Sequence, residues 1–254
     1  MSLRRAKQIL YAGFYILVWY GIISGVYYLF LKPVPSCFDN IKNQGEAGVD
    51  CGGLCAQVCV PEGIKPIALL ENVFSFQPDQ SHLSLLAHIN NPNFDSAARS
   101  FKYSFLLYDE QGNLVQKFSG NSFAYAGEVK YILVPNVVLP RASFSRVDFK
   151  AEDLDWVPKN SLDVAQIVIS GFTPSVTEKT ILIDGRVINK DKVSFPKVTI
   201  VAIFSGRFGE PAAASETEIE NLAPNESQPF SVIHPALANI DIAGAKVFVY
   251  AKRP

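Results

Sequence analysis

An apolar stretch from Ile9 to Leu31 constrains the fold of this chain more than any other feature of its sequence. It contains 23 residues and no charged side chain. A helix rises about 1.5 Å per residue, so this stretch would span about 34 Å, enough to cross a bilayer core about 30 Å thick. We therefore expect a single transmembrane helix over residues 9–31, with the lipid bilayer as its partner. A cleaved signal peptide is less favoured, because its apolar region would be only about 7–15 residues long.

The charges that flank this stretch indicate how the chain is oriented. Arg4, Arg5 and Lys7 precede it, and Lys32 alone follows it directly. Lys and Arg are enriched on the cytoplasmic side of membrane spans. We therefore expect residues 1–8 to form a short cytoplasmic tail. The rest of this single-pass protein should lie on the outer side of the cell membrane.

The part beyond the span has a balanced charge. It holds all 24 acidic residues and 20 of the 23 Lys and Arg residues, a net charge of −4. No basic patch stands out among them, so we expect no nucleic-acid partner. Aromatic and β-branched residues are frequent there, which favours a folded ectodomain over a disordered one.

All four cysteines lie in one short segment, residues 33–63. They are Cys37, Cys51, Cys55 and Cys59. An even number of closely spaced cysteines outside the cell indicates two disulfides, in any of three pairings. Zinc is the weaker alternative, because the spacing does not give two C-x-x-C pairs. A segment this small cannot bury an apolar core, so crosslinks must replace one.

Four oxygen-bearing side chains of the same segment are candidate calcium ligands: Asp39, Asn43, Glu46 and Asp50. Ca²⁺ prefers such oxygens. On a twelve-residue calcium loop, however, Ile41 and Gln44 would stand where an acidic residue and a glycine are expected. We therefore favour turn formation and backbone capping by these side chains. Calcium stays open as the one cofactor that the sequence suggests.

From Ile64 onward the sequence is typical of an all-β fold. Short runs rich in Val, Ile, Phe and Tyr alternate with Gly, Pro, Asn and Asp. Residues 151–161 are expected to form a linker, with Trp156 packed between two domains. The expected strands are 68–76, 83–89, 102–108, 114–118, 128–134 and 143–150 in the first half, and 164–172, 180–188, 197–204, 215–219, 228–232 and 246–251 in the second.

An internal repeat connects the two halves. The matches are Ile89-Asn90 with Ile188-Asn189, Phe105–Asp109 with Val201–Ser205, and Ala126–Glu128 with Pro224–Glu226, at offsets of 99, 96 and 98 residues. A unit of just under about 100 residues suits a sandwich of about seven strands. The sequence therefore predicts two tandem Ig-like β-sandwiches, at residues 64–158 and 162–254.

The first repeat resembles the FxLYD domain family. The residues that carry the resemblance are Phe105, Leu107, Tyr108, Asp109 and Gly112, with Asn90 upstream. The second repeat keeps their character without their identity, as Val201, Ile203, Phe204 and Ser205. FxLYD domains are Ig-like sandwiches of secreted and membrane-attached bacterial proteins. The resemblance therefore implies a fold and a location, and no catalysis.

The cysteine segment is similar to a short module of many bacterial surface proteins. The similarity rests on the pattern C-x-D-x-I-x-N followed by V-D-C-G-G-x-C, which begins at Cys37 and ends at Cys55. This resemblance implies no particular activity. It does agree with a position between the membrane and the sandwiches, as a spacer that stands the larger domains off the bilayer.

These features together predict a non-enzymatic protein of the bacterial cell envelope, used for binding, adhesion or scaffolding with protein partners. The alternative is an accessory subunit of a secretion or pilus assembly, in which Gly21-x-x-x-Gly25 lets another helix approach the span. A hydrolase is the least favoured interpretation, because the sequence holds neither a nucleophile elbow nor a phosphate-binding glycine loop. We predict no catalytic residue.

Overall fold

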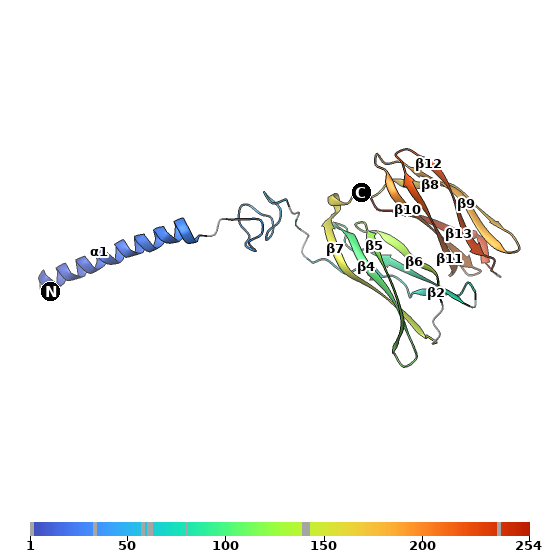
Figure 1. Ribbon diagram of the computed structural model, residues 1–254, viewed down its shortest axis with the longest axis horizontal. Coiled ribbons are helices and arrows are strands. Elements are labelled where there is room, and N and C mark those ends of the chain that lie inside the picture. Colours follow the sequence, from blue (N-terminus) through green and yellow to red (C-terminus); the bar gives the residue numbers. More distant parts are fainter. Residues whose placement is uncertain are drawn as a thin grey trace. The chain divides into compact units, whose positions relative to one another are not determined.

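The computed structural model describes residues 3–32, 35–56, 59, 63–79, 81–138, 143–237 and 240–254 (Figure 1). The chain divides into two compact units, Met1–Cys59 and Val60–Pro254. The first unit holds the N-terminal helix and the cysteine segment. The second unit holds every strand of the described chain, so the predicted all-β fold class with one apolar helix is confirmed.

The apolar stretch forms a helix, α1 (Leu3–Val26), which continues as a π-helical turn at Tyr27–Leu31. Residues Lys7–Leu31 are long and apolar enough to cross a bilayer, and none of this span is buried against protein. Leu10, Tyr20 and Phe30 are each more than two-thirds exposed. A helix that is apolar all round requires an apolar environment. The expected span is thus confirmed in its length and composition.

The first sandwich consists of two antiparallel sheets. In one sheet β3 pairs with β6 on one side and with the short strands β1 and β2 on the other. In the second sheet β4 lies between β5 and β7. The strands are β1 (Ala68–Leu69), β2 (Phe74–Phe76), β3 (His82–Asn90), β4 (Ser96–Tyr108), β5 (Leu114–Ala124), β6 (Val129–Val138) and β7 (Arg146–Pro158).

The second sandwich repeats this plan with six strands. Its sheets have the orders β12-β9-β8 and β11-β10-β13, and every pair is antiparallel. A short 3-10 turn, η2 (Lys159–Ser161), separates it from β7. The strands are β8 (Ile167–Val176), β9 (Thr180–Asn189), β10 (Phe195–Gly206), β11 (Pro211–Leu222), β12 (Ser227–Pro235) and β13 (Ile240–Ala251).

Each sandwich has its own core, built from alternate residues of its strands. Phe101, Phe105 and Leu107 of β4 point into the first core, and Ile200 and Phe204 of β10 point into the second. All five side chains are fully buried or nearly so. The period of two along each strand is what a buried sheet face requires.

A third apolar cluster joins the two sandwiches. Val201 and Ile203 of β10 are 1% and 3% exposed, and they pack with Leu86 of β3 and Leu133 of β6. Strand β10 is therefore buried on both faces, which explains its nearly unbroken apolar sequence. In Figure 1 the strands of the first sandwich lie directly beside those of the second. The two sandwiches therefore form one compact unit rather than two independent domains.

Two hydrogen bonds with tyrosine hydroxyls reinforce this interface. The Tyr131 amide donates to the Tyr250 hydroxyl at 3.0 Å, and the Tyr125 hydroxyl donates to the Ala251 carbonyl at 2.8 Å. Strand β6 is an edge strand, so the Tyr131 amide has no neighbouring strand on that side. The second sandwich therefore satisfies a backbone group that the first leaves unpaired.

The prediction of a linker at residues 151–161 is wrong over most of that range. Strand β7 continues through Pro158 and pairs with β4, where Trp156 lies opposite Ala98. The Trp156 side chain packs on the core of the first sandwich, not between the domains. Ala151, Leu154 and Trp156 are three and then two residues apart, because the β4–β7 register shifts there, so the sequence lacks the strict alternation of a strand. The charged residues among them lie on the solvent side of this edge strand.

The two sandwiches do repeat the same arrangement of strands and turns, but two of the predicted residue matches are wrong by one residue. Asn91 and Asn189 are equivalent: both are fully buried, and their amides donate to the carbonyls of Glu128 and Glu226, 98 positions apart like the asparagines themselves. Asn90 is thus not the counterpart of Asn189. Likewise the turn hydrogen bonds Gly112 N to Asp109 O and Gly209 N to Gly206 O set an offset of 97.

This offset changes which side chains of the two sandwiches correspond. Phe105 then matches Ala202 and Leu107 matches Phe204, all of which lie in the cores. The predicted partners Val201 and Ile203 lie on the opposite face, against the first sandwich. A slip of one residue moves a strand's whole set of side chains to the other face. Because β10 is apolar on both faces, its sequence does not reveal the slip.

Candidate functional site

The cysteine segment forms two disulfides, Cys37–Cys55 and Cys51–Cys59. The described chain holds no free cysteine. The prediction of disulfides is therefore confirmed, and the pairing that the sequence left open is fixed. The zinc alternative is excluded, because a sulfur in a disulfide is no thiolate ligand.

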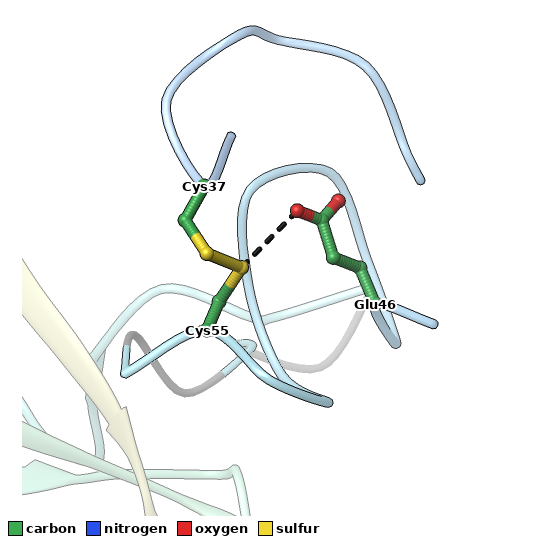
Figure 2. Close-up of side chains that lie close together, drawn as sticks. All are labelled: Cys37, Glu46 and Cys55. Carbon is green, nitrogen blue, oxygen red and sulfur yellow. Dashed lines mark hydrogen bonds between the residues drawn. A yellow bond between two sulfur atoms is a disulfide. The ribbon is translucent and has the colours of Figure 1, made fainter. Parts of the chain in front are cut away.

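Glu46 occupies the centre of this module (Figure 2). It is 5% exposed, and Oε2 accepts hydrogen bonds from the amides of Asn43 and Asp50 at 3.3 and 3.1 Å. Oε1 lies 3.1 Å from Sγ of Cys55. A disulfide sulfur carries no proton, so this is a polar contact with the disulfide rather than an ordinary hydrogen bond. The same chemistry removes Cys37, Glu46 and Cys55 as a metal-binding group, although their ligand atoms lie close together.

Of the other predicted calcium ligands, the carboxylates of Asp39 and Asp50 accept hydrogen bonds from nearby N–H groups, whereas the Asn43 side chain donates one. Asp50 accepts from the amides of Asp39 and Asn40, and Asp39 accepts from the amide of Ile41 and from Nδ2 of Asn43. The bond from Asn43 and the one from the Ser36 amide lower the pKa of Asp39. The structure thus brings Asp39, Asn43, Glu46 and Asp50 together as turn-forming groups. Calcium binding at them stays a prediction.

Backbone packing in the module depends on Gly53. Its φ angle is +61°, and a Cβ there would collide with the carbonyl oxygen of Gly45. Only glycine adopts this positive φ without strain and leaves room for the Gly45 carbonyl. The module is therefore held by its two disulfides, one buried carboxylate and a close backbone crossing, in place of an apolar core.

The predicted signature residues of the first sandwich have structural roles. Phe105 and Leu107 are fully buried in the core, and Tyr108 carries the Arg146 guanidinium 4.8 Å above its ring. Asp109 Oδ1 accepts hydrogen bonds from the amides of Gln111 and Asn113, which close the β4–β5 turn. Those bonds and one from the Asn113 side chain lower the pKa of Asp109. Gly112 takes φ +83° in the same turn.

A cleft that no sequence motif predicts lies between the two sandwiches. Its volume is about 350 Å³, and its walls come from β4, β5 and β6 of the first sandwich and β10, β11 and β13 of the second. A volume of this order lies at the small end of ligand-binding pockets, about 300–1,000 Å³. Four aromatic residues, Tyr103, Phe123, Tyr131 and Tyr250, line it together with charged residues from both walls.

A buried lysine occupies the first wall of this cleft. Lys130 of β6 is 5% exposed, and its ammonium group donates to the carbonyl of Phe123 at 3.1 Å. The ammonium lies 3.5 Å from the centre of the Phe123 ring and 5.1 Å from that of Tyr250. Burial lowers the pKa of Lys130 to about 8, and the nearby Glu128 opposes that shift only in part.

The second wall carries two glutamates with different surroundings. Glu218 pairs with Lys197, whose Nζ lies 2.5 Å from its carboxylate. The Glu216 carboxylate, by contrast, makes no hydrogen bond or ion pair with any residue that the structure describes, although its backbone lies in the β10–β11 ladder. Burial and the neighbouring charge of Glu218 raise the pKa of Glu216 to about 7. Burial and the charge of Glu216 also raise the pKa of Tyr103, which reaches the cleft from the opposite sandwich.

One signal in the sequence could have pointed to this cleft. Lys130 interrupts the β6 pattern at an inward position, two residues before the core residue Ile132. A lysine at such a position seldom lies in a core without a partner. The remaining wall residues come from strands of both sandwiches, and their meeting depends on the packing of one sandwich on the other.

Comparisons with known proteins add no family. No family model matches this chain, and no curated protein matches it. Among solved structures, red sea bream transglutaminase is similar at 11% sequence identity, with a TM-score of 0.21 over 74% of this chain. The match spans only 31% of that protein and carries no argument about fold or activity. Membership in the FxLYD family accordingly stays a prediction from the residues of β4.

Proposed function

We propose that this chain is a single-pass protein of the cell membrane with its N-terminus in the cytoplasm. Its disulfide module and sandwich pair then lie outside, where they bind protein partners of the cell envelope without catalysing a reaction. One observation carries the proposal. An apolar helix is followed, within a few residues, by a module that two disulfides hold together.

The disulfides support the outside location. Disulfides persist in oxidising compartments, whereas cytosolic thiols are kept reduced. The module buries no residues except Glu46 and Cys55 among those described, so it has little else to stabilise it. A chain built this way is suited to the outer side of a membrane. The positive charges before the span agree with the same orientation.

The sandwich pair supports a binding role. Its two domains share a buried interface, so surfaces on both keep a fixed relation to one another. At the tip of the β10–β11 hairpin the Phe208 side chain is 96% exposed. Aromatic side chains are enriched in protein interfaces, and loops held by a rigid scaffold are their usual location. Phe208 is therefore the side chain that we would first test as an anchor for a partner.

Limited proteolysis of intact cells tests the location. Protease added from outside should remove the unit Val60–Pro254 of the full chain and leave the helix in the membrane fraction. Cells lysed before protease addition provide the control for accessibility. Protection of the C-terminal unit in intact cells, with cleavage only after lysis, would contradict the proposal.

Crosslinking tests the binding role. A photo-reactive residue at position 208 of the full chain should give a discrete crosslinked product on living cells. The matched control carries the same group at position 164, which is also exposed (57% for Val164). Equal crosslinking at both positions, or none at either, would count against a partner at the hairpin tip.

Exchange of the helix separates an anchor from an assembly element. Residues 9–31 are replaced by an unrelated membrane span of equal length, with the flanking charges kept. If the helix is an anchor, crosslinking from position 208 persists. If it is a subunit contact of a secretion or pilus assembly, the crosslink is lost although the protein still reaches the membrane. An activity screen of the full chain against ester, peptide and glycoside substrates tests the non-enzymatic role, which any saturable turnover would overturn.

A further inference from the structure

The cleft between the sandwiches has two charged poles that the protein leaves incompletely satisfied. Its basic pole is Lys130, on the wall formed by the first sandwich, and its acidic pole is Glu216, on the wall formed by the second. The cluster that joins the sandwiches and the Tyr131–Tyr250 hydrogen bond fix the two walls relative to one another. The shape of the cleft is therefore set by the packing of the two sandwiches.

The ammonium group at the basic pole has fewer hydrogen-bond acceptors than it has N–H donors. The Lys130 ammonium has three N–H donors, and one carbonyl oxygen, that of Phe123, accepts from it within the described chain. Two aromatic faces cover part of the remaining surface. The carboxylate whose charge acts on Lys130, that of Glu128, accepts a hydrogen bond from the Tyr125 amide through Oε2. An incoming carboxylate would supply the acceptor that this ammonium lacks.

The acidic pole lacks a cation. Lys197 and Lys252 are the other basic residues that line the cleft, and the Lys197 ammonium is engaged by Glu218 at 2.5 Å. Tyr103 of the first sandwich lines the same cleft, and after burial the charge of Glu216 is the second cause that raises its pKa. A carboxylate beside an aromatic ring is the environment that binds an ammonium group, through ion pairing and contact with the ring face.

The two poles do not neutralise one another. The shift in the pKa of Lys130 arises from burial and Glu128, and that of Glu216 from burial, Glu218 and Lys197. The Lys130 ammonium bonds to the Phe123 carbonyl, and among the described residues no ion pair joins it to Glu216. A molecule that carries one charge of each sign can contact both.

We propose that this cleft binds a small zwitterion, an amino carboxylate no larger than a dipeptide, with its carboxylate at Lys130 and its ammonium at Glu216. The volume of about 350 Å³ suits a ligand of that size. The aromatic side chains would contact the carbon chain between the two charges. This inference goes beyond the membrane-anchored binding role and does not depend on the side of the membrane on which the unit lies.

The test is calorimetric titration of the detergent-solubilised full chain near neutral pH with a ladder of probes. Glycine, 4-aminobutanoate, 6-aminohexanoate and diglycine place the two charges at increasing separation. We expect saturable binding with an optimum at one length. For the best probe, the N-acetylated form lacks the ammonium and the methyl ester lacks the carboxylate. Each modified form should bind at least tenfold more weakly.

Variants assign the poles. Lys130→Met and Glu216→Gln should each weaken the best probe at least tenfold. The controls Lys117→Met and Glu220→Gln change exposed residues on β5 and β11 outside the cleft, and they should alter the affinity by less than twofold. The comparison of modified probes needs no variant, so it stands even where Lys130→Met fails to fold.

Three results would overturn the proposal. The first is no saturable binding of any probe at millimolar concentration. The second is equal binding of the N-acetylated and free forms, which would indicate an anion site instead. The third is unchanged affinity in Glu216→Gln. A unit shown by proteolysis to face the cytoplasm would leave these measurements unaffected, so failure of the proposed function and failure of this inference are distinguishable.

Discussion

The disulfide module and the sandwich pair reach a fixed structure by opposite means. In the module the buried residues, among those described, are Glu46 and Cys55. In the second sandwich alone the core holds Phe195, Phe204, Ile181, Ile183 and eleven further buried apolar residues around them. One region depends on covalent crosslinks and carboxylate hydrogen bonds, and the other on area removed from water.

This difference makes stability depend on different conditions in the two regions. A short crosslinked loop loses its fold when its disulfides are reduced, because it has no apolar core that could stabilise it. The sandwich pair has no disulfide in the described chain and should not respond to reductant. Mutations that separate these two kinds of stability test the comparison, and we give them from the largest expected effect to the smallest.

Removal of one crosslink should unfold the module alone. The variant Cys51→Ser with Cys59→Ser leaves the other disulfide in place, and loss of a native disulfide from a small domain costs about 2–5 kcal/mol. We expect the amide hydrogens of Asp39 and Asn40, which bond to Asp50 in the native module, to lose their protection from exchange. Hydrogen exchange with mass readout measures this loss.

The sandwich pair provides the internal control of that experiment. The melting temperature of the unit Val60–Pro254 should be unchanged by the double serine variant. A module that keeps its protected amides without the Cys51–Cys59 disulfide would contradict the account of how it is held together.

A charge at the interface should destabilise the sandwich pair strongly. In Val201→Asp a carboxylate replaces a side chain that is 1% exposed between the two sandwiches. A buried, unpaired charge costs about 3–5 kcal/mol. Urea denaturation followed by the fluorescence of Trp156, which packs on the first core, measures the loss.

The matched control for this change is Val164→Asp, at a residue that is 57% exposed. Its free energy of unfolding should stay within about 0.5 kcal/mol of the native value. If Val201→Asp were equally mild, the two sandwiches would be independent domains and the cluster between them would have no energetic role.

The buried asparagines should matter equally in both sandwiches. Asn189 donates through Nδ2 to the carbonyls of Val193, Leu222 and Ala223, and Asn91 donates to those of Ser96 and Tyr125. Substitution by alanine leaves these buried carbonyls unpaired, which we expect to cost about 2–4 kcal/mol in each case. Chemical denaturation of both variants measures the two losses, with the exposed Asn160→Ala as the control. Similar losses would show that the two asparagines have the same role in the two sandwiches.

The smallest effect is a dependence of stability on pH through Glu216. Its pKa is raised from 4.5 to about 7 in the folded chain. The folded carboxyl therefore keeps a proton that the unfolded chain releases. This contribution to stability is complete below pH about 4.5 and is lost as the pH rises through about 7.

The variant Glu216→Gln removes this titration. Between about pH 5 and pH 7.5 the native chain should lose on the order of 1–2 kcal/mol more stability than the variant. Denaturation at both pH values measures the difference. Identical pH profiles for the two proteins would show that Glu216 is solvated like an ordinary surface carboxylate.

The sequence was sufficient for the features that depend on local chemistry. The length of the Ile9–Leu31 run, the count of cysteines and the turn at Asp109 and Gly112 each have a short-range cause, and all three are present in the structure. Most strands were located as well, although 68–76 is two short strands, β1 and β2.

The features that depend on packing between distant segments could not be predicted. Nothing in the sequence of β10 distinguishes Val201, which faces the other sandwich, from Ile200, which faces its own core. The sequence of β7 predicts a linker because this edge strand has a charged outer side. The cleft needs Tyr103, Lys130 and Glu216 in one place, and only the packing of one sandwich on the other brings them together.

Disulfide mapping of freshly isolated protein tests the central claim most directly. Full-length chain is taken from cells into an alkylating reagent, digested without reduction and mapped by mass spectrometry. The account predicts the linked peptides Cys37–Cys55 and Cys51–Cys59 and no alkylated cysteine. Four alkylated thiols would contradict it, because a reduced module is expected only where the chain beyond the helix lies in a reducing compartment.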